Sequence, residues 1–116
     1  MYTRLQPILN VRSIEVEKQF YVRLGFKVTY QAEGFVALAF GEQILFGLQQ
    51  AEHADPLAFE QQMLWQIGVD SVGEVANLCE REGLLIETPM KLQPWGEWTL
   101  AICSPCGYRI TFEGPE

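Results

Sequence analysis

The sequence contains little of what metalloproteins and nucleic-acid-binding proteins usually require. Its 116 residues include one histidine, three cysteines and eight lysines or arginines, against 15 aspartates or glutamates. Histidine and cysteine are the usual protein ligands of zinc and related metals. A net charge of −7 disfavours contact with nucleic-acid phosphates. We therefore expect no nucleic-acid partner, whereas a cationic small molecule is compatible with the charge.

Long hydrophobic runs are also missing. No stretch approaches the roughly 18–20 apolar residues of a membrane-spanning helix. The N-terminus, M-Y-T-R-L-Q-P, lacks the charged and apolar regions of a secretory signal. These observations predict no membrane partner and a cytoplasmic location, where thiols stay reduced. A hydrophobic content of 48% predicts a single folded domain over residues 1–116.

A β-α-β-β-β pattern is present twice. In the first half, Ser13 is a typical helix N-cap and Gly25 ends that helix. In the second half, the helix is capped by Asp70 or Ser71 and ends at Gly83. The expected helices are 13–24 and 71–82, and the expected strands are 5–11, 26–32, 35–40, 43–48, 63–69, 84–88, 97–103 and 108–113. The sequence therefore predicts an α+β protein with module one at about 4–48, a linker at about 49–61 and module two at about 62–114.

Cys103 and Cys106 form a C-x-x-C pair within C-S-P-C-G-Y. This spacing is compatible with a zinc half-site, a redox pair or a turn between strands. Serine, proline and glycine at 104, 105 and 107 suit a turn. A thioredoxin-like pair needs its first cysteine at a helix N-terminus instead. We predict a hairpin turn with Cys106 exposed at its tip and Cys103 at the end of a strand.

Several motifs, in this order, resemble the vicinal oxygen chelate superfamily, which contains glyoxalase I, extradiol dioxygenases and bleomycin resistance proteins. The motifs are L-N-V-R-S, F-Y-V-R-L-G-F-K-V at 20–28, F-V-A-L-A-F-G-E-Q-I-L-F at 35–46, I-G-V-D-S-V, P-W-G at 94–96 and S-P-C-G-Y-R-I-T-F at 104–112. The resemblance implies two βαβββ modules that form a curved mixed sheet with a concave cleft. It also implies a homodimer, often with modules exchanged between subunits, whose clefts lie at the subunit interface.

The resemblance further implies a divalent cation held by one histidine or glutamate from each of four strands. The corresponding positions here are Gln6, Leu38, Leu64 and Thr111, and none carries an imidazole or a carboxylate. The single histidine, His53, falls in the predicted linker. We therefore expect no metal and no other cofactor, and the likeness is greatest to the metal-free, bleomycin resistance-like members.

Strand alternation assigns side chains to the two faces of each sheet. If Thr111 faces the cleft, so do Arg109 and Glu113, while the residues between them face the helix. The resemblance places Trp95 where bleomycin resistance proteins stack a tryptophan on the drug. Strand alternation places Trp65 and Trp98 on the helix side, in the core. Tyr30 is a further candidate at the rim. The predicted ligand-binding residues are Val36, Leu38, Phe40, Phe46, Leu64, Gln66, Trp95, Cys103, Arg109 and Thr111.

These predictions favour a protein without catalytic activity that sequesters a hydrophobic or cationic aromatic compound, as in antibiotic resistance of the bleomycin type. Candidate acidic groups beside the ligand are Glu33, Glu42, Glu97 and Glu113. Two enzyme alternatives stay open. One is a metal-dependent lyase or dioxygenase with ligands relocated to Glu33, Glu42, His53 or Glu113. The other is a metal-independent acid/base enzyme that uses Arg109 and Glu113.

Overall fold

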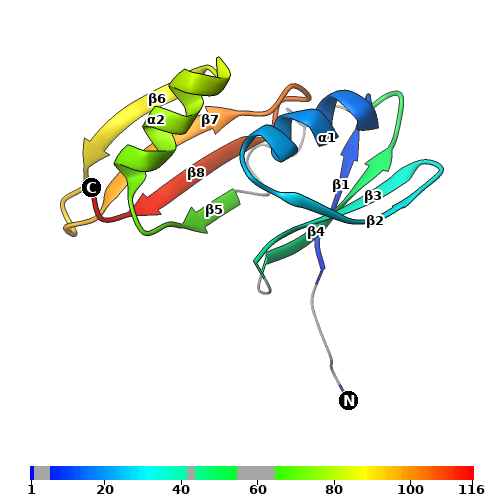
Figure 1. Cartoon of the computed structure of the whole chain (residues 1–116), viewed down its shortest axis with the longest axis horizontal. Helices are drawn as coiled ribbons and strands as arrows, with labels where there is room; N and C mark the ends of the chain where they lie inside the picture. Colours follow the sequence, from blue (N-terminus) through cyan, green and yellow to red (C-terminus); the bar gives the residue numbers. More distant parts are fainter. Residues whose placement is uncertain (2–5, 42–43, 55–64) are drawn as a thin grey trace. The chain divides into compact units, whose positions relative to one another are not determined.

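The computed structural model describes residues 1, 6–41, 44–54 and 65–116, which form two compact units divided between Asp55 and Pro56. Unit 1 consists of β1 (Ile8–Val11), α1 (Ile14–Arg23), β2 (Lys27–Ala32), β3 (Phe35–Phe40) and β4 (Ile44–Gln50). Unit 2 consists of β5 (Trp65–Gly68), α2 (Val72–Glu82), β6 (Ile86–Leu92), β7 (Trp98–Cys103) and β8 (Arg109–Gly114). The predicted α+β class and the repeated βαβββ order are confirmed (Figure 1).

The two units have the same sheet topology. The strand order is β1-β4-β3-β2 in unit 1 and β5-β8-β7-β6 in unit 2. In each sheet the first and last strands of the unit pair in parallel, and the remaining neighbours pair antiparallel. The structure therefore contains two four-stranded mixed sheets, one for each module, rather than one sheet shared between them.

Both helices begin at a serine cap, as expected. The Ser13 hydroxyl accepts a hydrogen bond from the Val16 N–H at 3.4 Å, and the Ser71 hydroxyl accepts one from the Glu74 N–H at 3.2 Å. Such caps satisfy N–H groups that have no partner within the helix. The side chain of Gln50 joins the start of α1 to the end of β4, because its oxygen accepts from the Ile14 N–H at 2.9 Å. The local capping signals therefore place both helices.

Strand β6 differs from the sequence prediction, which ended a strand at residue 88 and continued with a loop. In the structure this strand runs to Leu92 and contains Pro89. Since β6 is the outermost strand of its sheet, the missing N–H of proline breaks no essential ladder bond. The pairing with β7 is irregular on both sides of Thr88. Strand β4 likewise extends to Gln50, into the predicted linker.

Each unit buries its core between its helix and one face of its sheet. In unit 1, Tyr21 of α1 packs edge-on against Phe46 of β4, with ring centroids 5.0 Å apart, and against Phe26, at 5.8 Å. In unit 2, the buried residues include Val72 and Cys79 of α2 and the strand residues Leu100, Ile102, Ile110 and Phe112. Neither of the two helices in the described residues is long and apolar enough to cross a membrane.

Candidate ligand-binding face

Each sheet has one face packed on its helix and a second face, here called the helix-free face. The strand register shows which residues share this second face. In unit 1, Ile8 lies opposite Gly47, Gly47 opposite Ala37, and Ala37 opposite Tyr30. In unit 2, Gln66 lies opposite Thr111, Thr111 opposite Ala101, and Ala101 opposite Thr88. The same four places in the fold therefore carry an apolar and aromatic row in unit 1 and a largely polar row in unit 2.

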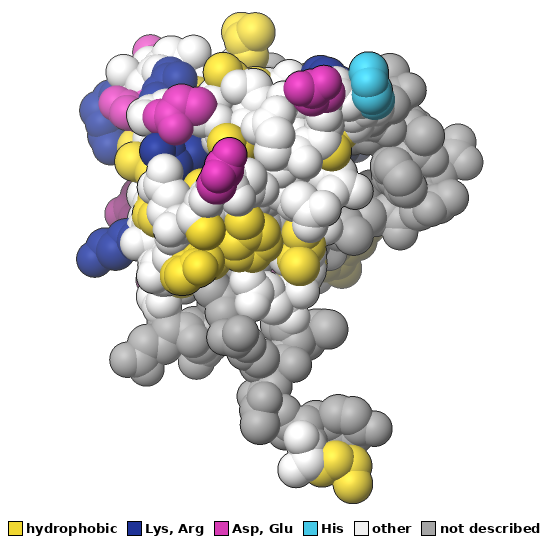
Figure 2. Space-filling view, turned by 90° about the vertical axis from the view of Figure 1, so that its right-hand side faces the viewer, with side chains coloured by type: hydrophobic (Ala, Val, Ile, Leu, Met, Phe, Trp, Pro, Cys, Tyr) yellow, Lys and Arg dark blue, Asp and Glu magenta, His cyan; other side chains and the backbone are white. Residues whose placement is uncertain are grey.

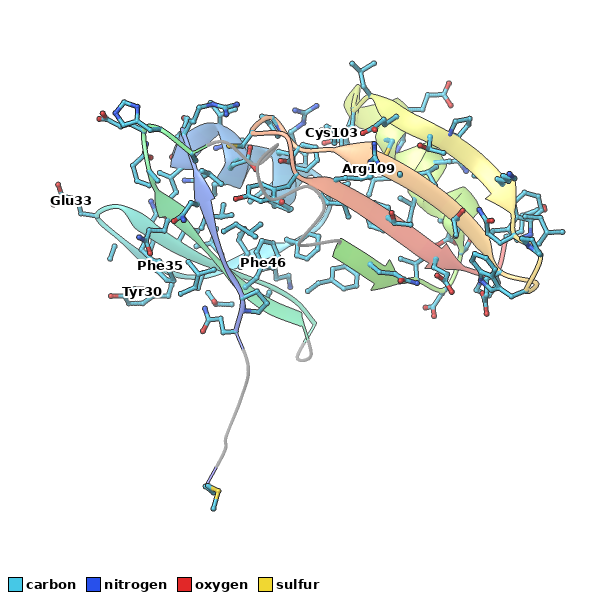
Figure 3. All side chains as sticks on the ribbon, turned by 180° about the vertical axis from the view of Figure 1, so that it is seen from behind. Tyr30, Glu33, Phe35, Phe46, Cys103 and Arg109 are labelled. Atoms are coloured by element: carbon cyan, nitrogen blue, oxygen red, sulfur yellow. The ribbon has the colours of Figure 1, made fainter. Side chains whose placement is uncertain are left out.

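The ring of Phe35 lies across the apolar row of unit 1. A Cβ atom added to Gly47 would lie 2.6 Å from Phe35 Cζ and 3.5 Å from Ile8 Cγ1, so the ring occupies the space beside the glycine. The Tyr30 ring contacts the Phe35 ring at a centroid distance of 6.3 Å (Figure 3). Tyr30 is 60% exposed and Ile8 is 49% exposed. We call Ile8, Tyr30, Phe35, Ala37 and Gly47 the apolar face.

The helix-free face of unit 2 is crossed by polar pairs. Arg109 of β8 forms an ion pair with Glu87 of β6, and Cys103 of β7 lies opposite Arg109 (Figure 3). The Gln66 amide donates a hydrogen bond to the Glu113 carboxylate. These partnered side chains give the face hydrogen-bonding and charged groups but no aromatic surface.

A shallow depression of about 370 Å³ also lies in unit 2. Its polar lining includes Gln66, Asp70, Glu97 and Glu113. These carboxylates can attract a cation, but Glu113 is already hydrogen-bonded to Gln66. Acidic lining of an open depression does not select one ligand class.

The predicted face is wrong for Val36, Leu38, Phe40 and Phe46. Leu38 is completely buried and lies opposite Phe46, whose ring packs on Tyr21 of α1. Phe40 also belongs to the helix side, because its ring packs against that of the buried Phe26, with ring centroids 5.5 Å apart. The segment F-V-A-L-A-F is apolar at every position, so polarity did not reveal which face is buried. The larger Val36 and Leu38 fill the core beside α1, and alanines occupy the opposite face.

In unit 2 the predicted faces are confirmed. Ile110 and Phe112 are buried towards α2, while Arg109 and Cys103 are exposed and Thr111 is half-buried. Here the alternating polar and apolar residues of β8 made the assignment clear. Gln66 lies on the same helix-free face, opposite Thr111. That Gln66, Cys103, Arg109 and Thr111 contact a ligand stays a prediction. Leu64 and Glu42 lie outside the described residues.

Trp95 is 64% exposed at the tip of the β6–β7 hairpin. The Gly96 N–H donates to the Gln93 carbonyl at 3.0 Å, and the Gln93 N–H donates to the Glu97 carbonyl at 2.8 Å. The Gln93 side chain also donates to Thr99 Oγ1 at 2.8 Å. This bonding holds the tip in a defined conformation, so Trp95 is available for stacking, and its contact with a ligand stays a prediction. Trp98 is half-buried, and the Trp65 side chain lies outside the described part of the chain.

The C-S-P-C segment forms the predicted turn. The Gly107 N–H donates to the Ser104 carbonyl at 2.9 Å, and Gly107 has a φ of 108°, which favours glycine. The expected exposure of Cys106 is wrong, because this residue is only 5% exposed. A thiol behaves as a small apolar group and tolerates such burial. Cys103 is exposed at the end of β7, and each of the three cysteines is a thiol.

The side chains present do not fit the divalent metal that the resemblance implies. Leu38 faces α1, and Thr111 and its partner Gln66 are weak, neutral oxygen donors. Within residues 1, 6–41, 44–54 and 65–116, no three histidine, cysteine, aspartate or glutamate side chains converge as metal ligands would. The relocated candidates among these residues, Glu33, His53 and Glu113, therefore form no such group.

Sequence reasoning missed Phe35, Ala37 and Gly47, although one signal was available. An isolated glycine inside a strand often marks a close approach by another group. Gly47 interrupts the apolar strand Ile44–Gln50, and the group that approaches it is the Phe35 ring.

Comparisons with known proteins agree with this architecture. A family model described as the Glyoxalase/Bleomycin resistance protein/Dioxygenase superfamily matches residues 4–112. A bleomycin resistance determinant encoded on the transposon Tn5 is 24% identical with a TM-score of 0.81, covering 99% of each chain. A bleomycin-binding protein complexed with bleomycin is 24% identical with a TM-score of 0.78, covering 99% of this chain and 100% of that one. Lactoylglutathione lyase from Agrobacterium tumefaciens is 15% identical with a TM-score of 0.75, and the alignment covers 96% of this chain and 92% of that one. No curated protein sequence matches the chain.

Proposed function

The chain belongs to the glyoxalase/bleomycin resistance protein/dioxygenase superfamily, and on that basis we propose that it sequesters a hydrophobic or cationic aromatic small molecule without changing it chemically. The observation that carries the proposal is the apolar face of unit 1. There the rings of Tyr30 and Phe35 contact each other, Phe35 and Ile8 both lie close to Gly47, and Tyr30 and Ile8 are exposed.

Such a surface suits a flat ring system. Aromatic side chains contribute about 0.5–1.5 kcal/mol per well-placed ring contact beyond the burial of area, and they also attract cations that lie over the ring face. Glu33 lies at the tip of the β2–β3 hairpin, between the strands that carry Tyr30 and Phe35 (Figure 3). Figure 2 shows one face of the molecule on which hydrophobic side chains gather, with an acidic side chain beside them. The combination favours a planar ligand that carries positive charge.

The likeness to a bleomycin-binding protein and a bleomycin resistance determinant supports the same ligand class. We further propose that binding needs no metal, since the donors on the helix-free faces do not suit a divalent ion. The resemblance to the family supports a cytoplasmic homodimer with exchanged modules and a ligand cleft at its interface, in which the exposed Trp95 stacks on the ligand.

Fluorescence titration tests the proposal. Bleomycin, acridine orange and other planar cations are titrated into the protein while tryptophan emission is followed. The ligand is then recovered and its mass is compared with that of the starting compound. We expect quenching with a Kd in the micromolar range or tighter and an unchanged ligand. A flat response across the panel, or a changed ligand mass, would contradict the proposal.

Metal analysis tests the metal-free part separately. The purified protein is dialysed against nickel and zinc salts, and the bound metal is measured by elemental analysis. We expect far less than one ion per chain and no effect of a chelator on ligand affinity. One ion per chain with chelator-sensitive binding would instead favour the metal-dependent enzyme. Sedimentation equilibrium tests the homodimer.

A further inference from the structure

We propose that Gly47 and Phe35 together determine the specificity of the apolar face. The missing side chain at position 47 leaves room for the Phe35 ring over β4, so that the face presents an aromatic surface where unit 2 projects the side chain of Thr111. This inference rests on the proposed function and specifies the ligand as a planar ring system held by stacking rather than by coordination or deep polar contacts.

The strand register places Gly47 and Thr111 at equivalent positions. Gly47 lies between its parallel partner Ile8 and its antiparallel partner Ala37, just as Thr111 lies between Gln66 and Ala101. Position 111 therefore projects a polar side chain from the middle of its sheet. At the same place in unit 1, the chain provides only backbone.

The space above that backbone is filled by Phe35. A Cβ atom on Gly47 would lie 2.6 Å from Phe35 Cζ and 2.7 Å from Phe35 Cε2, which is closer than packed carbon atoms approach. Phe35 of β3 lies opposite Gln49 of β4, so Gly47, two residues from Gln49 on the same strand, is the diagonal neighbour of Phe35. Aromatic side chains reach diagonal neighbours in antiparallel pairs, and a ring laid over a glycine covers its exposed backbone.

Unit 2 lacks this arrangement because its equivalent residues are short and polar. Thr99 takes the place of Phe35, since Thr99 lies opposite Glu113 as Phe35 lies opposite Gln49. Thr111 takes the place of Gly47. Any side chain at position 47 would displace the Phe35 ring from its place over β4, because a Cβ atom there would lie too close to two ring atoms. Ligand choice therefore depends on position 47 even though glycine has no side chain to contact a ligand.

A double-mutant cycle tests this dependence, with acridine orange as the probe. Phe35→Ala, Gly47→Ala and the double variant are compared with the unmodified protein by dye titration. We expect each single substitution to weaken dye binding by about tenfold. We expect the double variant to bind no worse than Phe35→Ala alone, because the added methyl group then displaces nothing.

Gly68→Ala is the matched control, because Gly68 is also a strand glycine and a Cβ atom there meets nothing within 4 Å. It should leave dye affinity unchanged. Phe35→Leu gives a milder variant should Gly47→Ala fold poorly. The packing itself has a separate readout, since an aromatic ring in contact with Gly47 displaces its Hα resonances from their ordinary positions and Phe35→Leu removes that displacement.

The outcomes separate the two proposals. Absence of dye and bleomycin binding by the unmodified protein would overturn the proposed function and this inference with it. A second outcome would overturn the specificity role alone. In it, the unmodified protein binds the dye normally, and the variants either keep this affinity or lose it in a strictly additive way. An unshifted Gly47 Hα would also overturn the specificity role alone.

Discussion

The two units share one framework and differ in the chemistry of their helix-free faces. Towards the helices, equivalent positions stay apolar: Val36 and Leu48 pair in unit 1 as Leu100 and Phe112 do in unit 2. On the other side, the apolar row of unit 1 corresponds to the polar row of unit 2. The helix side is constrained by packing, whereas the helix-free side can change without loss of the fold. This difference is the reason why we propose the helix-free face of unit 1 as the ligand-binding face.

The largest expected effect tests the similarity of the buried faces. Leu38→Ala and Ile102→Ala remove equivalent, fully buried side chains, so each should lower the free energy of unfolding by about 2–5 kcal/mol. Urea denaturation followed by circular dichroism measures both. Val28→Ala, at a strand residue that is 39% exposed, is the control and should cost less than about 1 kcal/mol. An unchanged urea midpoint for Leu38→Ala would contradict the burial of Leu38 against α1 and would favour a place on the helix-free face.

The next effect tests the contrast between the helix-free faces. Tyr30→Ala should weaken binding of a planar cationic dye by roughly 2- to 12-fold, the equivalent of one aromatic contact. Thr88→Ala changes the corresponding position of unit 2 and should leave affinity unchanged. Fluorescence titration compares the two variants directly. If Thr88→Ala produced the larger loss, the ligand would have to be assigned to the polar face.

A smaller effect concerns the polar pairs of unit 2. The Arg109 and Glu87 side chains are 41% and 36% exposed, so the ion pair is screened by solvent. Glu87→Gln should lower the free energy of unfolding by less than about 1 kcal/mol, and the difference should fade in 1 M salt. Glu33→Gln, an exposed turn residue of unit 1, is the reference. A loss of several kcal/mol that persists in high salt would show that the pair is structurally essential.

The smallest effect appears only at alkaline pH. Burial raises the pKa of the Cys79 thiol above its value in the unfolded chain, which is about 8.5. Below that pH the thiol is protonated in both states, so its contribution to stability is fully present. As pH rises, the unfolded chain loses the proton first, and this contribution is lost as pH rises towards the folded pKa. Urea unfolding from pH 7 to 10 under reducing conditions should show a steeper decline for the unmodified protein than for Cys79→Ala. If both proteins lost stability equally as pH rises, the raised pKa of the Cys79 thiol would be contradicted.

The sequence predicted the framework well because its signals are local. The serine caps and the glycines after the helices define both helices, and the alternation in Arg109–Glu113 identifies the buried side of β8. Residues 35–40 offered no such alternation, since all six are apolar. Their orientation depends on which side chains α1 and the neighbouring strands can accommodate, and that is decided only in the folded unit.

The candidate site was predicted less well for the same reason. Tyr30 was recognised as an exposed aromatic residue, but its contact with Phe35 depends on the irregular pairing between β2 and β3 near Thr29. The close approach of Phe35 to Gly47 joins residues twelve positions apart through the register of β3 and β4. Likewise, Cys106 is buried although turn chemistry alone favours an exposed tip.

The central claim is that the apolar face of unit 1 holds a planar ligand, and chemical-shift mapping tests it most directly. Amide and methyl resonances of the isotope-labelled protein are recorded while acridine orange or bleomycin is added. The largest shifts should occur at Ile8, Tyr30, Phe35 and Gly47, with small changes at Gln66, Thr88 and Thr111. Shifts concentrated on those three residues of unit 2, with unit 1 unchanged, would contradict the claim.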